Sequence, residues 1–521
     1  MTQNGPIQHI VIVGGGTAGW LTAGLLASEH GGEGPEAVRV TLVESPDVKT
    51  IGVGEGTWPT MRGTLARIGI PEREFLTECQ AAFKQGTRFD RWVTGAEDDR
   101  YYHPFTAPSG YPGFDVAAHW LREREKVSFV DASSPQGYLC DRGLAPKELA
   151  APDYAGVANY GYHLDAGRFA GLLARHGTER LGVSHILDHV TAVNGDPDGN
   201  IPSITTRNHG ELAADLFIDC TGLASLLIGR HYGIGLLELD DVLFNNAALA
   251  VQVPYEDPEA PIACQTISTA QDVGWVWDIG LQNRRGVGYV YSTAHASDDE
   301  AHATLARHLG VEPDRIEPRK IGFRPSHRER FWHRNCVAIG MSAGFLEPLE
   351  ASALVLVELS ARAISDAMPQ DRDDMARQAE RFNTGFRYRW ERIVEFLKLH
   401  YVLSQRDSQY WDDNRNAESI PPALVESLER WRHHVPVPDD LPRHDEVFSA
   451  ASYQYVLYGM DFDSSLRRSA RFDRERERAV GFFNDNIRRA NRLVAQLPAH
   501  RRLLEALAAR PATPGAAGGR S

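Results

Sequence analysis

A glycine-rich turn near the start of the chain constrains the fold more than any other sequence feature. Residues 10–13 form a β-branched run that predicts a buried strand, and residues 20–27 are rich in Ala and Leu, which favours a helix. Between them lies Gly14-x-Gly16-x-x-Gly19. Glycines at these places allow a tight turn and a close approach to a pyrophosphate, and the first N–H groups of the helix attract the phosphates. The segment therefore predicts a dinucleotide-binding site; a glycine turn without a ligand is the alternative.

Further strand ends extend this site along the chain. The strand predicted at residues 38–43 ends at Glu44, whose carboxylate can accept hydrogen bonds from ribose hydroxyls. Strands predicted at residues 216–219 and 336–339 lead into a Thr-Gly turn and into Gly340. One sheet assembled from distant segments is expected, and this layout suits the long FAD molecule better than NAD. Since the chain has no second Gly-x-Gly-x-x-Gly for NADPH, we expect a separate flavin reductase to supply reduced FAD.

Size, charge and cysteine content limit the classes of function. The 521 residues are too many for one ordinary core, so two or more structural units are expected. A net charge of -15 disfavours binding to nucleic acid. The chain has no long apolar run to cross a membrane, and its polar N-terminus lacks the pattern of a signal peptide. Five widely spaced cysteines without a Cys-x-x-Cys pair predict no disulfide framework and no metal site, so a reducing cytoplasm fits best.

Composition changes along the chain predict two units in a discontinuous arrangement. Residues 1–97 and 155–395 are expected to form an FAD-binding domain. Residues 98–154 are rich in Pro and aromatic residues and resemble an insertion, which we expect to join residues 396–509 in a mostly helical substrate-binding domain. Residues 510–521 consist mainly of Pro, Ala, Gly and Ser, which predicts a disordered tail.

Short motifs in a fixed order resemble the flavin-dependent tryptophan halogenases. The matching segments are GGGTAGW (14–20), IGVGEGT (51–57), AAFK (81–84), YHPF (102–105), GWVWDI (274–279) and GFLEPLEASA (344–353). Together these segments are specific for that family, although no single one of them is. The resemblance implies an α/β (α+β) fold: a Rossmann-like FAD-binding unit of the flavoprotein monooxygenase type with an added, mostly helical substrate domain. Besides Gly14, Gly16, Gly19 and Glu44, it assigns FAD contacts to Thr17, Ala18, Val53, Gly54, Val190, Met341 and Leu354.

The resemblance also implies a reaction. In the family, reduced FAD and oxygen form a flavin hydroperoxide, a halide ion attacks it, and the resulting hypohalous acid moves through the protein to a lysine beside an aromatic substrate. That lysine resembles Lys84, which would hold the acid by hydrogen bonding or form a haloamine. A glutamate like Glu350 would stabilise the cationic arenium intermediate or take its proton. Lys84 and Glu350 are therefore the expected catalytic residues.

The local sequence around Lys84 allows two interpretations. Apolar residues from Phe75 to Phe83 lie at helical spacing, so we expect a helix that carries Lys84 at the border of an apolar stripe and ends at Gly86. A lysine near an apolar pocket is less hydrated and more nucleophilic. The alternative is a surface lysine that extends over the edge of the helix into solvent.

Glu350 stands just before a predicted helix at residues 351–364. Its alternative role is that of an acid stabilised by the dipole at the helix N-terminus. The same helix start offers the backbone N–H groups of Ser352 and Ala353, to which the resemblance assigns binding of the halide ion. The family commonly has Ser-Thr-Gly after the glutamate, whereas this chain has Ala351-Ser352-Ala353, so the choice between chloride and bromide stays open.

Aromatic residues are expected to hold the substrate and to shield the flavin. His103 and Phe105 resemble the family pair that sandwiches an aromatic ring; core aromatics in a loop are the alternative. Trp275 and Trp277 match a Trp-x-Trp-x-Ile-Pro motif that is thought to separate the flavin from organic substrate, although Gly280 replaces the proline. One buried face of a strand is the alternative for these tryptophans. Three late tyrosines occur where the family has further substrate residues, and packing explains them equally well: Tyr453, Tyr455 and Tyr458.

These observations favour an enzyme that uses reduced FAD, O2 and chloride or bromide to halogenate an electron-rich aromatic, with an indole or tryptophan derivative as the expected substrate. Two other functions stay open: a flavin-dependent aromatic hydroxylase and a non-catalytic flavin-binding protein. The presence of both Lys84 and Glu350 counts against the last of these. The expected partners are a small aromatic molecule and a flavin reductase, and a homodimer is allowed.

Overall fold

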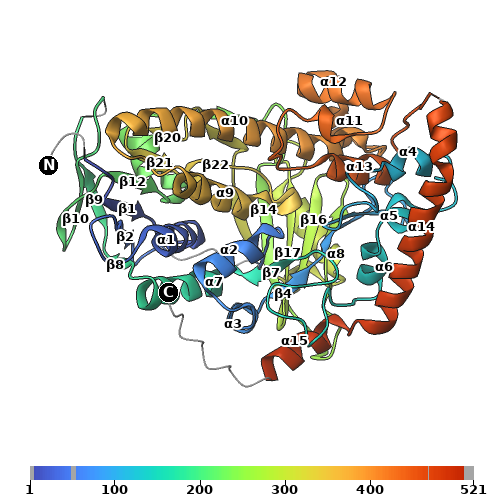
Figure 1. The fold of residues 1–521 in the computed structure, drawn as a ribbon, viewed down its shortest axis with the longest axis horizontal. Helices are drawn as coiled ribbons and strands as arrows, with labels where there is room; N and C mark the ends of the chain where they lie inside the picture. Colours follow the sequence, from blue (N-terminus) through green and yellow to red (C-terminus); the bar gives the residue numbers. More distant parts are fainter. Residues whose placement is uncertain (1–4, 49–53, 197, 468, 510–521) are drawn as a thin grey trace.

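The computed structural model describes residues 5–48, 54–196, 198–467 and 469–509 of the chain. Its first sheet has six strands in the order β20-β21-β12-β1-β2-β8, and all neighbouring strands are parallel except β20 and β21. The strands come from distant parts of the chain, which confirms the expected assembly of one sheet (Figure 1). They are β1 (His9–Val13), β2 (Arg39–Glu44), β8 (Ser184–Leu187), β12 (Leu216–Asp219), β20 (Trp332–His333) and β21 (Cys336–Ala338).

The predicted glycine turn joins β1 to helix α1 (Thr17–His30). Gly14 has a φ of 117°, and a Cβ there would lie 2.2 Å from the carbonyl oxygen of Cys220, so only glycine fits between the ends of β1 and β12. A Cβ at Gly19 would lie 1.9 Å from the carbonyl oxygen of Gly14, so glycine also lets α1 start directly behind the strand. The strand–turn–helix that the sequence predicts is therefore present.

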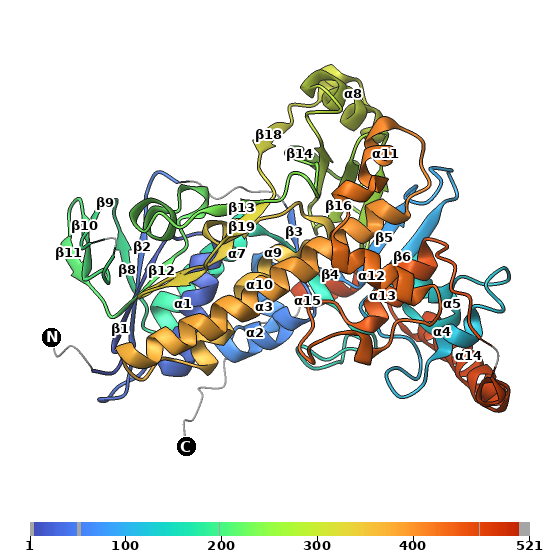
Figure 2. The same cartoon turned by 90° about the horizontal axis from the view of Figure 1, so that it is seen from above.

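A second, seven-stranded sheet lies toward the middle of the molecule in the order β18-β14-β17-β16-β15-β5-β6 (Figure 2). Its neighbouring strands are antiparallel except β15 and β5. The sheet carries the two predicted shielding tryptophans on β16 and His103 on β6. Its strands are β5 (Gly86–Asp90), β6 (Arg100–Pro104), β14 (Ala247–Pro254), β15 (Thr266–Ala270), β16 (Trp275–Gly280), β17 (Arg284–Tyr291) and β18 (Arg319–Gly322).

A small sheet, β3-β7-β4, carries Lys84 and corrects one prediction. Helix α3 (Glu72–Glu78) ends before Lys84, which is the last residue of strand β4 (Ala82–Lys84). Both β4 and β3 (Gly54–Gly56) pair with β7 (Gly161–Asp165), one on each side. The predicted helix through Lys84 is therefore wrong, because backbone pairing with a strand far along the chain overrides the local helical pattern.

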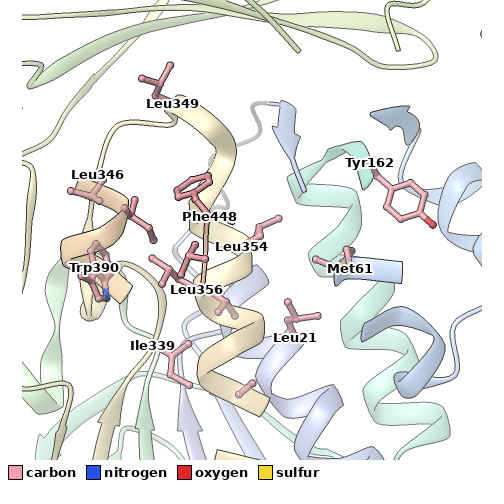
Figure 3. Packing of buried hydrophobic residues seen from close by; sticks show 14 of the residues in the cluster. Leu21, Met61, Tyr162, Ile339, Leu346, Leu349, Leu354, Leu356, Trp390 and Phe448 are labelled. Atoms are coloured by element: carbon pink, nitrogen blue, oxygen red, sulfur yellow. The ribbon is translucent and has the colours of Figure 1, made fainter. Parts of the chain in front are cut away.

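Two long helices contribute to a hydrophobic cluster that includes residues of both large sheets. α9 (Ser352–Asp366) packs against α1, and α10 (Arg372–Leu403) runs from β20 toward the C-terminal helices (Figure 1). Figure 3 shows apolar side chains of α9, Leu354 among them, between Leu21 of α1 and Trp390 of α10. The start of α9, where Glu350 precedes the helix, is thus held by packing on both sides.

The predicted insertion and the C-terminal segment pack together at one end of the molecule (Figures 1 and 2). Helices α4 (Val116–Trp120), α5 (Phe129–Ser133) and α6 (Gln136–Asp141) all contact α14 (Ala470–Gln496). The predicted boundary at residue 395 lies inside α10, and the division into two domains stays a prediction.

The rest of the chain adds shorter elements. Among the described residues, no helix is long and apolar enough to span a bilayer. The tail predicted at residues 510–521 lies outside the described residues. The remaining α-helices and strands are α2 (Thr60–Ile68), α7 (Ala166–Arg180), α8 (Asp298–Leu309), α11 (Gln409–Arg415), α12 (Pro422–Trp431), α13 (Ala450–Gly459) and α15 (His500–Ala509), with β9 (Val190–Val193), β10 (Ser203–Thr206), β11 (Gly210–Ala213), β13 (Leu236–Glu238), β19 (Ser326–Arg328) and β22 (Gly344–Phe345).

Candidate active site

The carboxyl ends of β1, β12 and β21 form a site suited to a dinucleotide. Gly16 precedes α1, no described side chain caps this helix start, and a Cβ at Gly16 would meet no atom within 4 Å. The first N–H groups of α1 therefore have no side-chain acceptor among the described residues, and the helix dipole favours a phosphate there. Gly340, with a φ of 72°, approaches α1 so closely that a Cβ there would lie 2.8 Å from Ala18 Cβ. Met341 follows and is 41% exposed, so these predicted FAD contacts lie together.

Glu44 ends β2 beside this turn, where the sequence predicts a ribose contact. Its carboxylate accepts a hydrogen bond from Trp20 Nε1 (3.3 Å) and lies 3.1 Å from His185 Nε2. A Cβ at Gly15 would lie 2.1 Å from Glu44 Cδ, so the glycine turn itself makes room for the carboxylate. The ribose contact stays a prediction that this placement allows.

The other predicted FAD contacts are more widely spaced. Val190 is half-buried at the start of β9, and Leu354 is buried in the first turn of α9. Gly54 begins β3, where a Cβ would lie 3.3 Å from Ile279 Cγ2. Glycine at this position thus lets β3 pass close to β16, the strand of the two predicted shielding tryptophans. Val53 lies outside the described residues.

Lys84 is buried at the end of β4. The residue is 1% exposed, and its ammonium forms no hydrogen bond with the described residues. Its Nζ lies 5.5 Å from the centre of the Phe105 ring. Burial lowers the pKa of Lys84 to about 8, and the negative charge of Glu350 opposes this shift. The surface-lysine interpretation is therefore wrong, and a larger fraction of the amine is neutral near pH 7 than for an exposed lysine.

The loop before α9 holds Glu350 in a strained backbone conformation. Glu350 (φ 63°, ψ 6°) and Ala351 (φ 54°, ψ 46°) both adopt the left-handed region. For residues with a side chain this costs about 1–2 kcal/mol each. Trp58 Nε1 donates to the Glu350 carbonyl oxygen (2.7 Å), and the Ala351 N–H donates to the carbonyl oxygen of Pro348 (2.9 Å). Strain of this kind persists only where the surroundings overdetermine it, and it concentrates at functional sites.

The Glu350 carboxylate lies between two imidazoles. His103 Nδ1 donates to Oε1 (2.7 Å), and His400 Nε2 lies 3.3 Å from the same oxygen without the alignment of a hydrogen bond. Burial alone would raise the pKa of Glu350, but His103 and His400 hold it well below its ordinary value. The carboxylate therefore binds imidazoles rather than capping α9, so the interpretation as an acid at a helix N-terminus does not account for it.

Aromatic rings surround His103. The ring centres of Phe396, Phe448 and Tyr455 lie 5.7, 6.5 and 6.3 Å from that of His103. Phe396 and Phe448 stack with their centres 3.7 Å apart, and Trp58 packs on Phe448 at 4.9 Å. His103, predicted to stack on the substrate, thus belongs to an aromatic cluster assembled from distant segments.

Sequence reasoning did not identify four residues near Glu350: Trp58, Phe396, His400 and Phe448. Trp58 directly follows the GEGT motif, and that position is a usable signal. Phe396 and His400 lie one turn apart on α10, whose helical pattern marks them only as core residues. Phe448 precedes α13 and has no local signal.

Both tryptophans of β16 are buried on one face of the strand. Their ring centres lie 6.3 Å apart, and Trp275 Nε1 donates to Glu347 Oε2 (3.0 Å). A Cβ at Gly288, which pairs with Trp277 in β17, would lie 2.0 Å from the Trp277 ring, so this glycine makes room for the indole. The packing fits the strand-face alternative, and the shielding role stays a prediction.

The remaining predicted residues lie at a helix start and in the core. Ser352 and Ala353 open α9, and among the described residues no side chain caps this helix start. Their N–H groups therefore have no side-chain acceptor there, as a halide site requires. The three late tyrosines are buried on α13, which fits packing. Tyr455 OH also donates to the carbonyl oxygen of Thr106 (2.9 Å), next to the half-buried Phe105.

A glycine turn at the carboxyl ends of a parallel sheet, together with a buried lysine and a buried glutamate, fits the class of flavin-dependent oxidoreductases. Within that class, the chain belongs to the tryptophan halogenase family, whose model matches residues 9–471. The chain is 33% identical to the tryptophan 6-halogenase of Streptomyces toxytricini over 87% of this chain and 89% of that protein. It is 31% identical to the tryptophan 7-halogenase of Lentzea aerocolonigenes over 95% and 98% of the two chains.

Solved structures agree with this assignment. The crystal structure of a tryptophan halogenase from Shewanella frigidimarina matches with a TM-score of 0.94 at 47% identity, covering 96% of this chain and 98% of that one. The predicted α/β fold with a helical substrate region is thereby confirmed. The chain is a flavin-dependent halogenase, an enzyme of a family that uses FAD and a halide, and the hydroxylase and non-catalytic alternatives are not favoured.

Proposed function

We propose that this chain halogenates an electron-rich aromatic, an indole or a tryptophan derivative, at a centre formed by Lys84 and Glu350. The observation that carries the proposal is that a buried amine and the loop of a buried carboxylate meet beside Gly56. A Cβ at Gly56 would lie 3.1 Å from Lys84 Nζ and 3.3 Å from Ala351 Cβ. Burying an amine without a hydrogen-bond acceptor costs free energy, so a role in chemistry is a better explanation of Lys84 than packing.

Lys84 would present the electrophilic halogen to the substrate. With a pKa of about 8, about a tenth of the lysines are neutral at pH 7. The neutral amine can react with hypohalous acid to give a haloamine and water, and the ammonium can instead hold the acid by hydrogen bonding. In both cases the strand fixes where the halogen stands, which determines the carbon that reacts.

Glu350 would stabilise the arenium cation and accept its proton. Its low pKa keeps the carboxylate ionised at neutral pH, and its buried position strengthens the attraction to a cationic ring. His103 donates to Oε1, whereas Oε2 accepts no hydrogen bond from the described residues. Oε2 is thus the oxygen available to the substrate proton.

The other predicted residues would bind and orient the aromatic substrate, the halide ion and FAD. His103 and Phe105 stack on the aromatic ring, and the N–H groups of Ser352 and Ala353 hold the halide ion. The turn from Gly14 to Gly19 holds the pyrophosphate of FAD, which together with oxygen and halide supplies the hypohalous acid. A separate flavin reductase supplies the reduced flavin.

The test combines the purified chain with FAD, a flavin reductase, NADH, bromide and indole, and detects products by mass spectrometry. We expect brominated indole from the wild-type protein and its loss in Lys84→Ala. Lys126→Ala is the matched control, since Lys126 lies on the surface in a pair with Glu123. FAD absorbance of each variant shows whether the cofactor still binds.

Two results would contradict the proposal. Gain of one oxygen without any need for halide would indicate a hydroxylase. No turnover across a broad panel of indoles and phenols, despite bound FAD, would indicate a non-catalytic flavin-binding protein. Replacing bromide by chloride in the same assay then determines the halide preference.

A further inference from the structure

A second buried glutamate, Glu347, lies three residues before Glu350 in the same loop and is 1% exposed. Its carboxylate accepts hydrogen bonds from three segments of the chain. The donors are Trp275 Nε1 of β16 (3.0 Å), Asn245 Nδ2 before β14 (2.6 Å) and Tyr401 OH of α10 (2.8 and 2.9 Å). None of the catalytic roles proposed above involves Glu347.

The two N–H donors both bind Oε2 of Glu347, whereas, among the described residues, Oε1 lies beside only the Tyr401 hydroxyl (2.8 Å). An indole N–H can only donate, and the Asn245 amide is oriented by Tyr410 OH, which donates to its Oδ1 (2.9 Å) and leaves the NH2 group for Glu347. Burial raises the pKa of Glu347, while the hydrogen bonds from Trp275, Asn245 and Tyr401 oppose this rise. A glutamine at this position would remove the negative charge and would turn its NH2 group toward the Tyr401 hydroxyl, so the hydrogen bond from Tyr401 to Oε1 would be lost and the charge-assisted bonds from Trp275 and Asn245 would weaken.

α10 connects this network to the proposed reaction centre. Tyr401 binds Glu347, and the adjacent residue, His400, contacts Glu350 at 3.3 Å. One turn of α10 thus contacts the carboxylates of both Glu347 and Glu350, and β16 binds Glu347 from another direction. Since Glu350 and Ala351 are in the left-handed region, the loop needs such anchors to keep this conformation.

We propose that Glu347 is a positioning residue for halogen transfer, which keeps Glu350 and His400 in place through the loop and α10 without contacting the substrate. The inference rests on the proposed function. It implies that a chain without this anchor still binds FAD and still forms hypohalous acid, but transfers the halogen to the aromatic ring less efficiently. The acid that is not transferred escapes into solution.

The test measures two products of full-length Glu347→Gln with FAD, a flavin reductase, NADH, bromide and indole. One product is bromoindole. The other is free hypobromous acid, captured by added methionine as its sulfoxide, with catalase present to remove peroxide. We expect kcat for bromoindole to fall at least about tenfold, the ratio of sulfoxide to bromoindole to rise by a similar factor, and KM for indole to stay nearly unchanged. Tyr401→Phe removes one donor and should change the ratio in the same direction by less.

Glu358→Gln is the matched control. Glu358 is also a buried glutamate of this region, but it accepts hydrogen bonds from Thr60 and Thr64 of α2. We expect a wild-type product ratio for this variant. A wild-type ratio in both Glu347→Gln and Tyr401→Phe would overturn the inference, and so would an equal loss of sulfoxide and bromoindole. Absence of bromoindole with the wild-type protein would contradict the proposed function and, with it, this inference.

Discussion

Replacing Gly56 by alanine tests whether halogen transfer depends on the narrow gap between Lys84 and the Glu350 loop. The new methyl carbon would lie 3.1 Å from Lys84 Nζ and 3.3 Å from Ala351 Cβ. Gly56 does not have a positive φ, so the backbone accepts alanine and the perturbation acts through these two contacts.

The size of the effect follows from the distances. Non-bonded heavy atoms in good contact lie about 3.5–4.0 Å apart, so Lys84 Nζ must move by a few tenths of an ångström. Misplacing a reacting group by about 1 Å can lower a rate about 100-fold, which is about 2.7 kcal/mol in the barrier. Because the displacement is less than half of this, we expect kcat for halogenation to fall by about fivefold to tenfold. The end of the lysine side chain is flexible, so stability should change little.

The assay is steady-state bromination of indole by Gly56→Ala, together with FAD binding and thermal unfolding. Gly322→Ala is the matched control, because Gly322 also lies on a strand and a Cβ there would meet no atom within 4 Å. A kcat for Gly56→Ala within about twofold of the control, with the same FAD affinity, would refute the reasoning that the gap positions the lysine.

Three further predictions concern Lys84, Trp58 and Glu358. Burial lowers the pKa of Lys84 to about 8. If the neutral amine reacts, the rate of single-turnover halogenation should rise with pH up to about pH 8 and then level off. A rate that does not change with pH would exclude the haloamine route. Trp58→Phe keeps an aromatic ring on Phe448 but removes the N–H that donates to the Glu350 carbonyl oxygen, so the free energy of unfolding in urea should fall by about 1 kcal/mol. An unchanged free energy of unfolding would contradict this role of Trp58. Burial raises the pKa of Glu358 to about 7 from 4.5, so the folded chain holds a proton that the unfolded chain releases. Its contribution to stability is complete below the unfolded pKa and is lost as pH rises through 7. Glu358→Gln should therefore lose less stability than the wild type between pH 5 and 8, and parallel curves of unfolding free energy against pH would disprove this.

Much of the FAD-binding unit could be predicted because its signals are local. The β1 strand, the three glycines and α1 follow one another within a few residues, and steric contacts such as that between Gly14 and Cys220 allow no other residue at the turn. Lys84 and Glu350 were identified through motifs that surround them, and their burial agrees with the roles expected.

Other features of the fold and of the site could not be predicted, because they depend on contacts between distant residues that no local sequence pattern encodes. The apolar spacing before Lys84 predicts a helix, yet residues 82–84 become a strand because they pair with β7. His400 and Tyr401 look like ordinary core positions of a long helix, and only the loop that packs against α10 makes them partners of Glu350 and Glu347.

By itself, the sequence determined the strand–glycine–helix unit and the family, and it led to the proposal of Lys84 and Glu350 as the reactive groups, since each of these signals lies in neighbouring residues. Tertiary structure alone decided how these two groups behave. Burial makes Lys84 a weaker base, and His103 and His400 hold Glu350 ionised. Desolvation and charge pairing arise between residues far apart in the chain, so only the folded protein can set the protonation states on which the proposed chemistry depends.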